Sequence, residues 1–175
     1  MCCTSPVQAL SVIRPASCKG GSRAMTLAEL HERTFAHATP TTATSYPPER
    51  RLTAEQLTSY LDRRTYAVIG TTRPDGRPHA SMSTYIRRDT TFWLPTLPGS
   101  IRARNLACQP WLTLVVPEDE DDRHIMVIVE GPAQTFSLEE TPEDVRVALN
   151  REWVKAWIRV RAERVLSYAA VAASP

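Results

Sequence analysis

From Tyr66 to Tyr168 the chain consists mainly of short apolar runs separated by turn sequences. The runs are rich in Val, Ile, Thr, Tyr and Trp, which favour β-strands. Only two connections, 100–108 and 141–153, have a pattern suited to a helix, so the strand–helix alternation of a parallel sheet is absent. We therefore predict a mainly β fold with a few helices and about six mostly antiparallel strands. A small barrel is expected, because closure removes exposed strand edges.

Turn residues define the ends of the expected strands. The sequence Arg73-Pro-Asp-Gly-Arg-Pro78 predicts a tight turn in which Gly76 adopts a positive φ. The acidic run 118–122 is expected to be the solvated tip of a hairpin. The predicted strands are Tyr66–Thr72, His79–Arg87, Thr91–Thr96, Trp111–Val116, His124–Val129, Ala133–Leu138, Trp157–Arg161 and Arg164–Tyr168.

Two helices flank the strand region. Thr53-Ala-Glu-Gln56 is a capping box, which predicts a helix over 54–63 with its apolar side buried. A second helix is expected to begin at Thr141, with Pro142 in its first turn. Three apolar residues of this second helix recur every four positions and should face the sheet: Val145, Leu149 and Trp153.

The first part of the chain differs from the rest. Residues 1–48 show no sustained hydrophobic period and end in a Thr- and Pro-rich stretch. We therefore predict a flexible N-terminal arm over 1–48, with one short helix over 26–38, and a barrel domain over 49–175. Met25 is an alternative start of translation, in which case residues 1–24 do not belong to the natural protein.

Composition narrows the classes of function. A chain of 175 residues suits one domain, and a net charge of +2 does not point to nucleic acid or to an anionic membrane. The basic residues are 19 Arg and 2 Lys, a bias that a GC-rich genome produces. The four cysteines form no Cys-x-x-Cys pair, so neither a metal site nor a disulfide framework is predicted. With no long apolar run, a cytoplasmic location is expected.

A loop and helix start after the third strand form a candidate anion site. Pro98-Gly99 ends the strand, and a short helix is expected from Ser100. The first turn of a helix leaves N–H groups unpaired and carries partial positive charge. Arg102 lies in this turn, and Asn105 follows on the same face. Ser100, Arg102 and Asn105 therefore form a candidate site for a phosphate or carboxylate; the alternative is that the arginines are solvated surface residues.

Short hydroxyl side chains lie on the neighbouring strands. Ser81 and Ser83 share one face of the second strand, and Thr96 ends the third. They could hydrogen-bond the edge of a flavin-like ring, although sheet surfaces also carry Ser and Thr without any ligand. No Gly-rich phosphate loop and no Ser/His/Asp arrangement is found. If the protein is an enzyme, a bound cofactor must carry the chemistry.

Together these residues resemble the pyridoxamine 5'-phosphate oxidase-like split β-barrel superfamily, and most closely its FMN- and deazaflavin (F420)-dependent oxidoreductases. The resemblance covers about 52–138 and resumes over 157–168. Three motifs carry it in this order: T-x-x-P-D-G-x-P at Thr71–Pro78, R-x-x-N-L at Arg102–Leu106 and V-x-G-x-A at Val129–Ala133.

The resemblance implies a homodimer with two cofactor sites at the subunit interface. Arg102 matches the position that binds the cofactor phosphate, and Asn105 belongs to the same motif. Ser81 and Ser83 match the strand along the ring, and Thr96 lies where the next strand meets the loop. Ser100 departs from relatives that carry a second basic residue.

The implied activity is hydride transfer from F420 or FMN to a small organic acceptor. The high-GC composition and the deazaflavin branch favour F420. The alternative is a non-catalytic protein that binds a flavin- or haem-type ligand on the same barrel.

Overall fold

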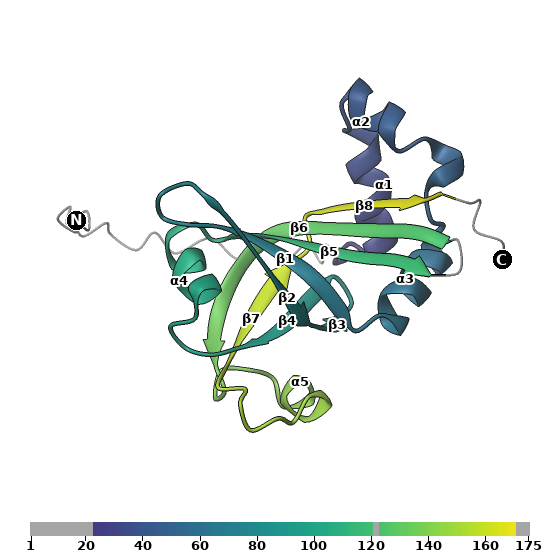
Figure 1. Ribbon diagram of the computed structural model, residues 1–175. Coiled ribbons are helices and arrows are strands. Elements are labelled where there is room, and N and C mark those ends of the chain that lie inside the picture. Colours follow the sequence, from purple (N-terminus) through teal and green to yellow (C-terminus); the bar gives the residue numbers. More distant parts are fainter. Residues whose placement is uncertain (1–22, 121–122, 171–175) are drawn as a thin grey trace, which may run out of the picture.

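In the computed structural model, the long strand β6 (Arg123–Ser137) belongs to both sheets of the fold (Figure 1). Over its first half it pairs with β5 (Trp111–Glu120) on one edge and with β8 (Arg164–Ala169) on the other. Over its second half, β7 (Ala156–Arg161) takes the place of β8. The prediction of two separate strands around Gly131-Pro132 is wrong, because β6 changes its partner without interruption.

Gly131 sits where this change of partner occurs. A Cβ atom at this position would lie 1.8 Å from the backbone oxygen of Arg161. At the preceding residue of β6, Glu130 O accepts a hydrogen bond from Glu163 N–H at 2.9 Å, and the pairing of β6 with β8 begins there. Only glycine permits this close approach of two backbones.

The remaining strands continue both sheets, in the order β2-β1-β5-β6-β7-β4-β3, and every pairing is antiparallel. The predicted fold class, mainly β with few helices and a barrel split into two sheets, is confirmed. The second predicted strand is divided at Tyr85. The bounds of these strands are Tyr66–Thr72 (β1), Pro78–Thr84 (β2), Ile86–Arg88 (β3) and Thr91–Thr96 (β4).

The structure describes residues 23–120 and 123–170. The capping box is confirmed: Thr53 N–H donates to Gln56 Oε1 at 2.9 Å, and Gln56 N–H donates to Thr53 Oγ1 at 3.3 Å. None of the helices in this part is long and apolar enough to cross a membrane. The helices are α1 (Leu27–Ala36), α2 (Pro40–Ser45), the 3₁₀ turn η1 (Pro48–Arg50), α3 (Ala54–Arg63), α4 (Ile101–Cys108) and α5 (Glu143–Ala148).

The helix α1 packs against β8 (Figure 1). Two of its leucines belong to the barrel core. Thr34 Oγ1 accepts a hydrogen bond from Val165 N–H at 3.0 Å, which satisfies a backbone donor of β8. The short helix predicted over 26–38 is confirmed. The flexible arm predicted over 1–48 is wrong from α1 onward, and its residues 1–22 lie outside the described part.

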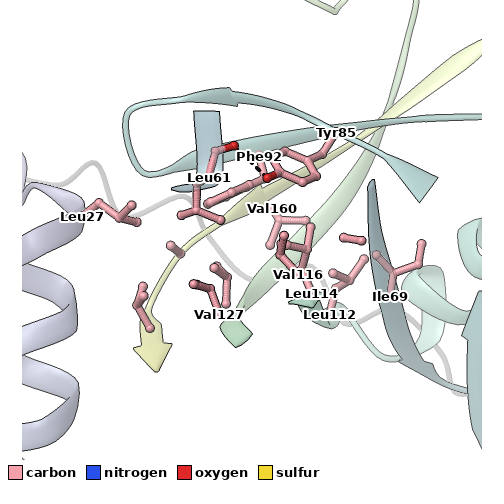
Figure 2. Close-up of a cluster of buried hydrophobic side chains, with 14 of the residues drawn as sticks. Leu27, Leu61, Ile69, Tyr85, Phe92, Leu112, Leu114, Val116, Val127 and Val160 are labelled. Atoms are coloured by element: carbon pink, nitrogen blue, oxygen red, sulfur yellow. Dashed lines mark hydrogen bonds between the residues drawn. The ribbon is translucent and has the colours of Figure 1, made fainter. Parts of the chain in front are cut away.

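Two apolar clusters stabilise the two sheets. The larger one fills the barrel between the strands, where Leu112, Leu114, Val116, Val127 and Phe92 are fully buried (Figure 2). The smaller one lies beneath α5 and consists of Trp93, Val145, Val154 and Trp157. Of the residues predicted to face the sheet from the second helix, Trp153 is 49% exposed, because that helix ends at Ala148.

The acidic run is only partly a solvated tip. Glu118 is buried, and its carboxylate forms ion pairs with Arg64 and, at 3.1 Å, with Arg63, both at the end of α3. The prediction is therefore wrong at this residue. Asp119 is exposed, and residues 121–122 lie outside the described part.

Candidate cofactor site

The ends of β2 and β4 meet beside the first turn of α4. β2 continues through Tyr85 into β3, which pairs with β4 so that Ile86 lies opposite Trp93. The end of β2 therefore runs beside the end of β4, and these two strands are in contact. β2, β4 and the start of α4 carry the predicted cofactor-binding residues: Ser81, Ser83, Thr96, Ser100, Arg102 and Asn105.

Three of these residues are joined by hydrogen bonds. Thr96 Oγ1 lies 3.0 Å from Ser100 Oγ and accepts from Arg102 Nε at 2.9 Å. Arg102 Nη2 also donates to Pro95 O at 2.7 Å. Ser100 is the N-cap of α4, and its Oγ accepts from Ala103 N–H at 3.3 Å. The guanidinium is thus fixed between the end of β4 and the first turn of α4.

The charge of Arg102 is not neutralised by a carboxylate. Its hydrogen-bond partners are neutral oxygens, and it forms no ion pair within the described residues. Arg87 and Arg88, by contrast, are paired with Asp62 and Asp144. Burial lowers the pKa of Arg102, as expected for a cation without a counter-ion. Together with the N-terminal end of α4, this half-buried guanidinium favours binding of an anion.

Asn105, one turn further along α4, contacts a different strand. It is buried, and its Nδ2 donates to Thr71 Oγ1 of β1 at 2.9 Å. Thr71 Oγ1 in turn lies 3.4 Å from His79 Nδ1. The structure therefore places Asn105 with Thr71 rather than with Thr96 and Ser100. The sequence reasoning did not include Thr71 or His79 in the site, although both belong to or flank the hairpin motif that starts at Thr71.

The two serines of β2 face the barrel interior. Ser81 lies opposite Ile69, and Ser83 lies opposite Ala67, so both serines share the face of these buried residues. Ser83 Oγ donates to Thr84 O at 2.9 Å. Ser81 Oγ is buried and has no hydrogen-bond partner within the described residues. A buried hydroxyl without a partner is expected where a ligand or a water completes the site.

The opposite face of the β1–β2 pair is apolar and open. Met82 is 68% exposed and Tyr66 is 63% exposed. Val68 lies between Met82 of β2 and Val115 of β5 in the pairing register, so the apolar surface continues across three strands. Apolar sheet faces of this kind mark interaction surfaces.

The chemistry of the gathered groups is binding rather than proton transfer. The predicted cofactor-binding residues supply hydroxyls, an amide and a guanidinium, none of which acts as a general base near neutral pH. The imidazole of His79 lies apart from them, beside Thr71 Oγ1. No group of three or more His, Cys, Asp or Glu that could hold a metal ion is found in residues 23–120 and 123–170.

Comparisons with known proteins bear on the family and the fold of the chain. The family model "Pyridoxamine 5'-phosphate oxidase" matches residues 53–173. No curated protein sequence matches the chain.

Three solved structures illustrate the similarity of fold. An FAD-binding protein from Mesorhizobium loti is 18% identical, with 70% of this chain and 98% of that chain covered and a TM-score of 0.57. An FAD-binding protein from Mycobacterium smegmatis is 18% identical, with 69% and 97% covered and a TM-score of 0.53. The haem storage protein HutZ from Vibrio cholerae is 14% identical, with 64% and 92% covered and a TM-score of 0.51. At these identities the likeness shows the fold alone.

Proposed function

Because the chain belongs to the pyridoxamine 5'-phosphate oxidase family, we propose that it is an oxidoreductase that binds a phosphate-bearing flavin-type cofactor at the start of α4. One observation carries the proposal: Arg102 is half-buried, fixed by Thr96 and Pro95, and lacks a carboxylate partner within the described residues. A charge arranged in this way costs stability unless an anion completes it. A cofactor phosphate is the anion that the family membership suggests.

The residues present fit such a cofactor. Arg102, the Ser100 hydroxyl and the N-terminal N–H groups of α4 would hold the phosphate. The unpartnered hydroxyl of Ser81 would bind the polar edge of the ring. A reduced flavin supplies a hydride for a small organic acceptor. The protein contributes placement of the ring and exclusion of water, because none of the predicted cofactor-binding residues is a general base.

The proposal includes a homodimer with the cofactor site at the subunit interface. The exposed apolar face around Tyr66, Val68 and Met82 supports the association of two copies, and not the place of the cofactor. This face lies on the reverse side of the sheet from Ser81 and Ser83. A second copy of the chain that covers it would remove the largest exposed side chains of β1 and β2 from water.

The identity of the cofactor is a finer proposal. Two FAD-binding proteins among the structural neighbours support a flavin, FMN or FAD. The deazaflavin F420, which the Arg-rich composition favours, is the alternative. A cytoplasmic location remains part of the proposal.

Titration of the purified protein with FMN, FAD and F420, followed by fluorescence, tests the site. Arg102→Ala should weaken binding roughly tenfold to a hundredfold, because a charge-assisted hydrogen bond to a phosphate contributes about 1.5–3 kcal/mol. Arg146→Ala removes an exposed arginine of α5 and should leave the affinity unchanged. An equal affinity of Arg102→Ala and the wild type would refute the site.

A non-catalytic ligand carrier is the competing function. The similarity of fold to a haem storage protein favours this alternative, as does the lack of a general base among the predicted cofactor-binding residues. Tight binding of a flavin, without reduction of any acceptor by the reduced complex, would support it. Binding of haem in preference to a flavin would replace the cofactor proposal.

A further inference from the structure

A pocket of about 640 Å³ lies between α4 and the second half of β6. This volume falls within the range of small-molecule sites. One wall is a stripe along α4 and its flanks, and the other consists of consecutive β6 residues and one loop residue. The lining residues used below are Gly99, Ala103, Arg104, Ala107, Gln134 and Phe136.

The pocket adjoins the proposed phosphate site. Gly99 directly precedes Ser100, the N-cap of α4. Ala103 lines the pocket, and its N–H is the donor that Ser100 Oγ accepts. The pocket therefore begins at the residues that flank Ser100 and Arg102 on α4.

The lining combines an aromatic wall with polar groups. Phe136 is fixed by the Arg159 guanidinium, whose carbon lies 4.5 Å from the ring centroid, and by an edge contact with Trp93. Gln134 supplies an amide next to this wall. Arg104 is exposed and forms no ion pair within the described residues, so its charge is available at the pocket.

A larger pocket elsewhere lacks these features. It has a volume of about 1020 Å³ and is lined by Arg87 and Arg88. The guanidinium of Arg87 is occupied by Asp62, and that of Arg88 by Asp144. Arg23 of this pocket is likewise paired with Glu29. Its fourth arginine, Arg159, lies over the Phe136 ring and donates to Gln134 Oε1 at 3.2 Å. This pocket therefore favours an anionic ligand less than the pocket along α4.

We propose that the pocket along α4 binds the nucleotide extension of FAD, with the second phosphate at Arg104 and the adenine against Phe136. This inference rests on the proposed function and deepens it, because it selects FAD over FMN. FMN ends at its phosphate and does not reach the pocket. Glu140 also lines the pocket, and its carboxylate opposes any anion placed beside it. FAD brings one further phosphate, which Arg104 would hold, whereas the tail of F420 brings several carboxylates and therefore suits the pocket less well.

A filling substitution tests the proposal. Ala107→Phe places a ring in the pocket, whereas Cys108→Phe adds the same ring at a neighbouring exposed position of α4 that does not line it. We expect Ala107→Phe to weaken FAD binding at least tenfold and to change FMN binding less than twofold. Cys108→Phe should change neither dissociation constant. Arg104→Ala, which does not fill the pocket, should weaken FAD several-fold and leave FMN unchanged.

The outcomes separate this inference from the proposed function. Equal wild-type affinity for FAD and FMN, or FAD binding that resists both Ala107→Phe and Arg104→Ala, would overturn the pocket assignment and leave the flavin site intact. Tighter binding of F420 than of FAD, with the same sensitivity to Ala107→Phe, would overturn the choice of an adenine nucleotide. Failure of the folded wild type to bind FMN, FAD and F420 would refute the proposed function itself.

Discussion

His31 should make the stability of the fold depend on pH. Its ring lies buried between α1 and β8, with Nε2 2.8 Å from Ser167 Oγ. The same Ser167 oxygen accepts from Leu52 N–H at 2.9 Å, which leaves the hydroxyl proton for His31 Nε2. The neutral ring is therefore the form that this site accommodates. Burial, and to a smaller extent the charge of Arg51, lower the pKa of His31 from 6.5 to about 4.

The sign and size follow from the two pKa values. In the unfolded chain His31 binds a proton near pH 6.5, whereas in the folded protein it does so only near pH 4. The unfolded state therefore binds more protons between these values, and acid favours unfolding. The stabilisation is complete above pH 6.5 and is lost as the pH falls toward 4. At 1.36 kcal/mol per pKa unit, roughly 2–3 kcal/mol is lost over this window.

Urea unfolding between pH 8 and 4.5 measures this loss. His31→Gln removes the titrating ring but keeps a polar group that can reach Ser167, so its free energy of unfolding should fall about 2–3 kcal/mol less than that of the wild type. Carboxylates affect both proteins alike and cancel in the difference. His37→Gln, at the exposed C-cap of α1, should retain the wild-type slope. Parallel curves for the wild type and His31→Gln would refute the reasoning.

Two further predictions concern the close contact of Gly131 with the Arg161 backbone and the exposed apolar face around Met82. Gly131→Ala should lower the free energy of unfolding by at least about 3 kcal/mol, because its Cβ would lie 1.8 Å from Arg161 O, whereas Gly70→Ala, whose Cβ would meet only ordinary contacts, should change it by less than about 1 kcal/mol. Urea unfolding measures both variants, and equal stability of Gly131→Ala and Gly70→Ala would contradict the close contact between Gly131 and the Arg161 backbone. Met82→Arg should convert the proposed dimer into monomers in analytical ultracentrifugation, and Val147→Arg, an equally exposed position on α5, should not. A monomeric wild type would remove the dimer proposal.

Local sequence signals predicted most of the elements. The capping box at Thr53 and Gln56 acts within one turn, and the predicted helix that follows it has the bounds of α3. The first predicted strand likewise coincides with β1, because alternation and the Pro-Asp-Gly turn are short-range features. The continuity of β6 was missed because its cause is not local. Gly131 was interpreted as the end of one strand and the start of another. Only the close approach of the Arg161 backbone shows that glycine is needed there for packing.

The helix over 26–38 was predicted, but its packing against the barrel was missed for a related reason. Residues 26–48 carry weak periodicity, and α1 is ordered by what it covers rather than by its own pattern. Thr34 satisfies Val165 N–H of β8, and His31 bonds Ser167 on the same strand. None of these partners can be inferred from a sequence in which they lie more than a hundred residues away.

At the candidate site, the sequence located the groups but not their partners. Helix periodicity placed Arg102 and Asn105 on one face, yet they are bound to different sheets. Arg102 bonds Thr96 at the end of β4, and Asn105 bonds Thr71 on β1. Spacing along a helix determines which side chains are neighbours, but the elements that meet that helix determine what each one binds.

The same two contacts connect the site to the architecture of the barrel. β1 belongs to the sheet that contains β5 and β8, and β4 belongs to the sheet that contains β7. Among the strands that the structure describes, the two sheets share only β6. α4 is thus attached to one sheet through Asn105 and to the other through Arg102. An anion held by Arg102 and the first turn of α4 binds a place whose geometry depends on both sheets. The binding energy of this anion therefore stabilises the position of the two sheets relative to each other. A bound cofactor should make both the separation of the sheets and the unfolding of α4 less favourable.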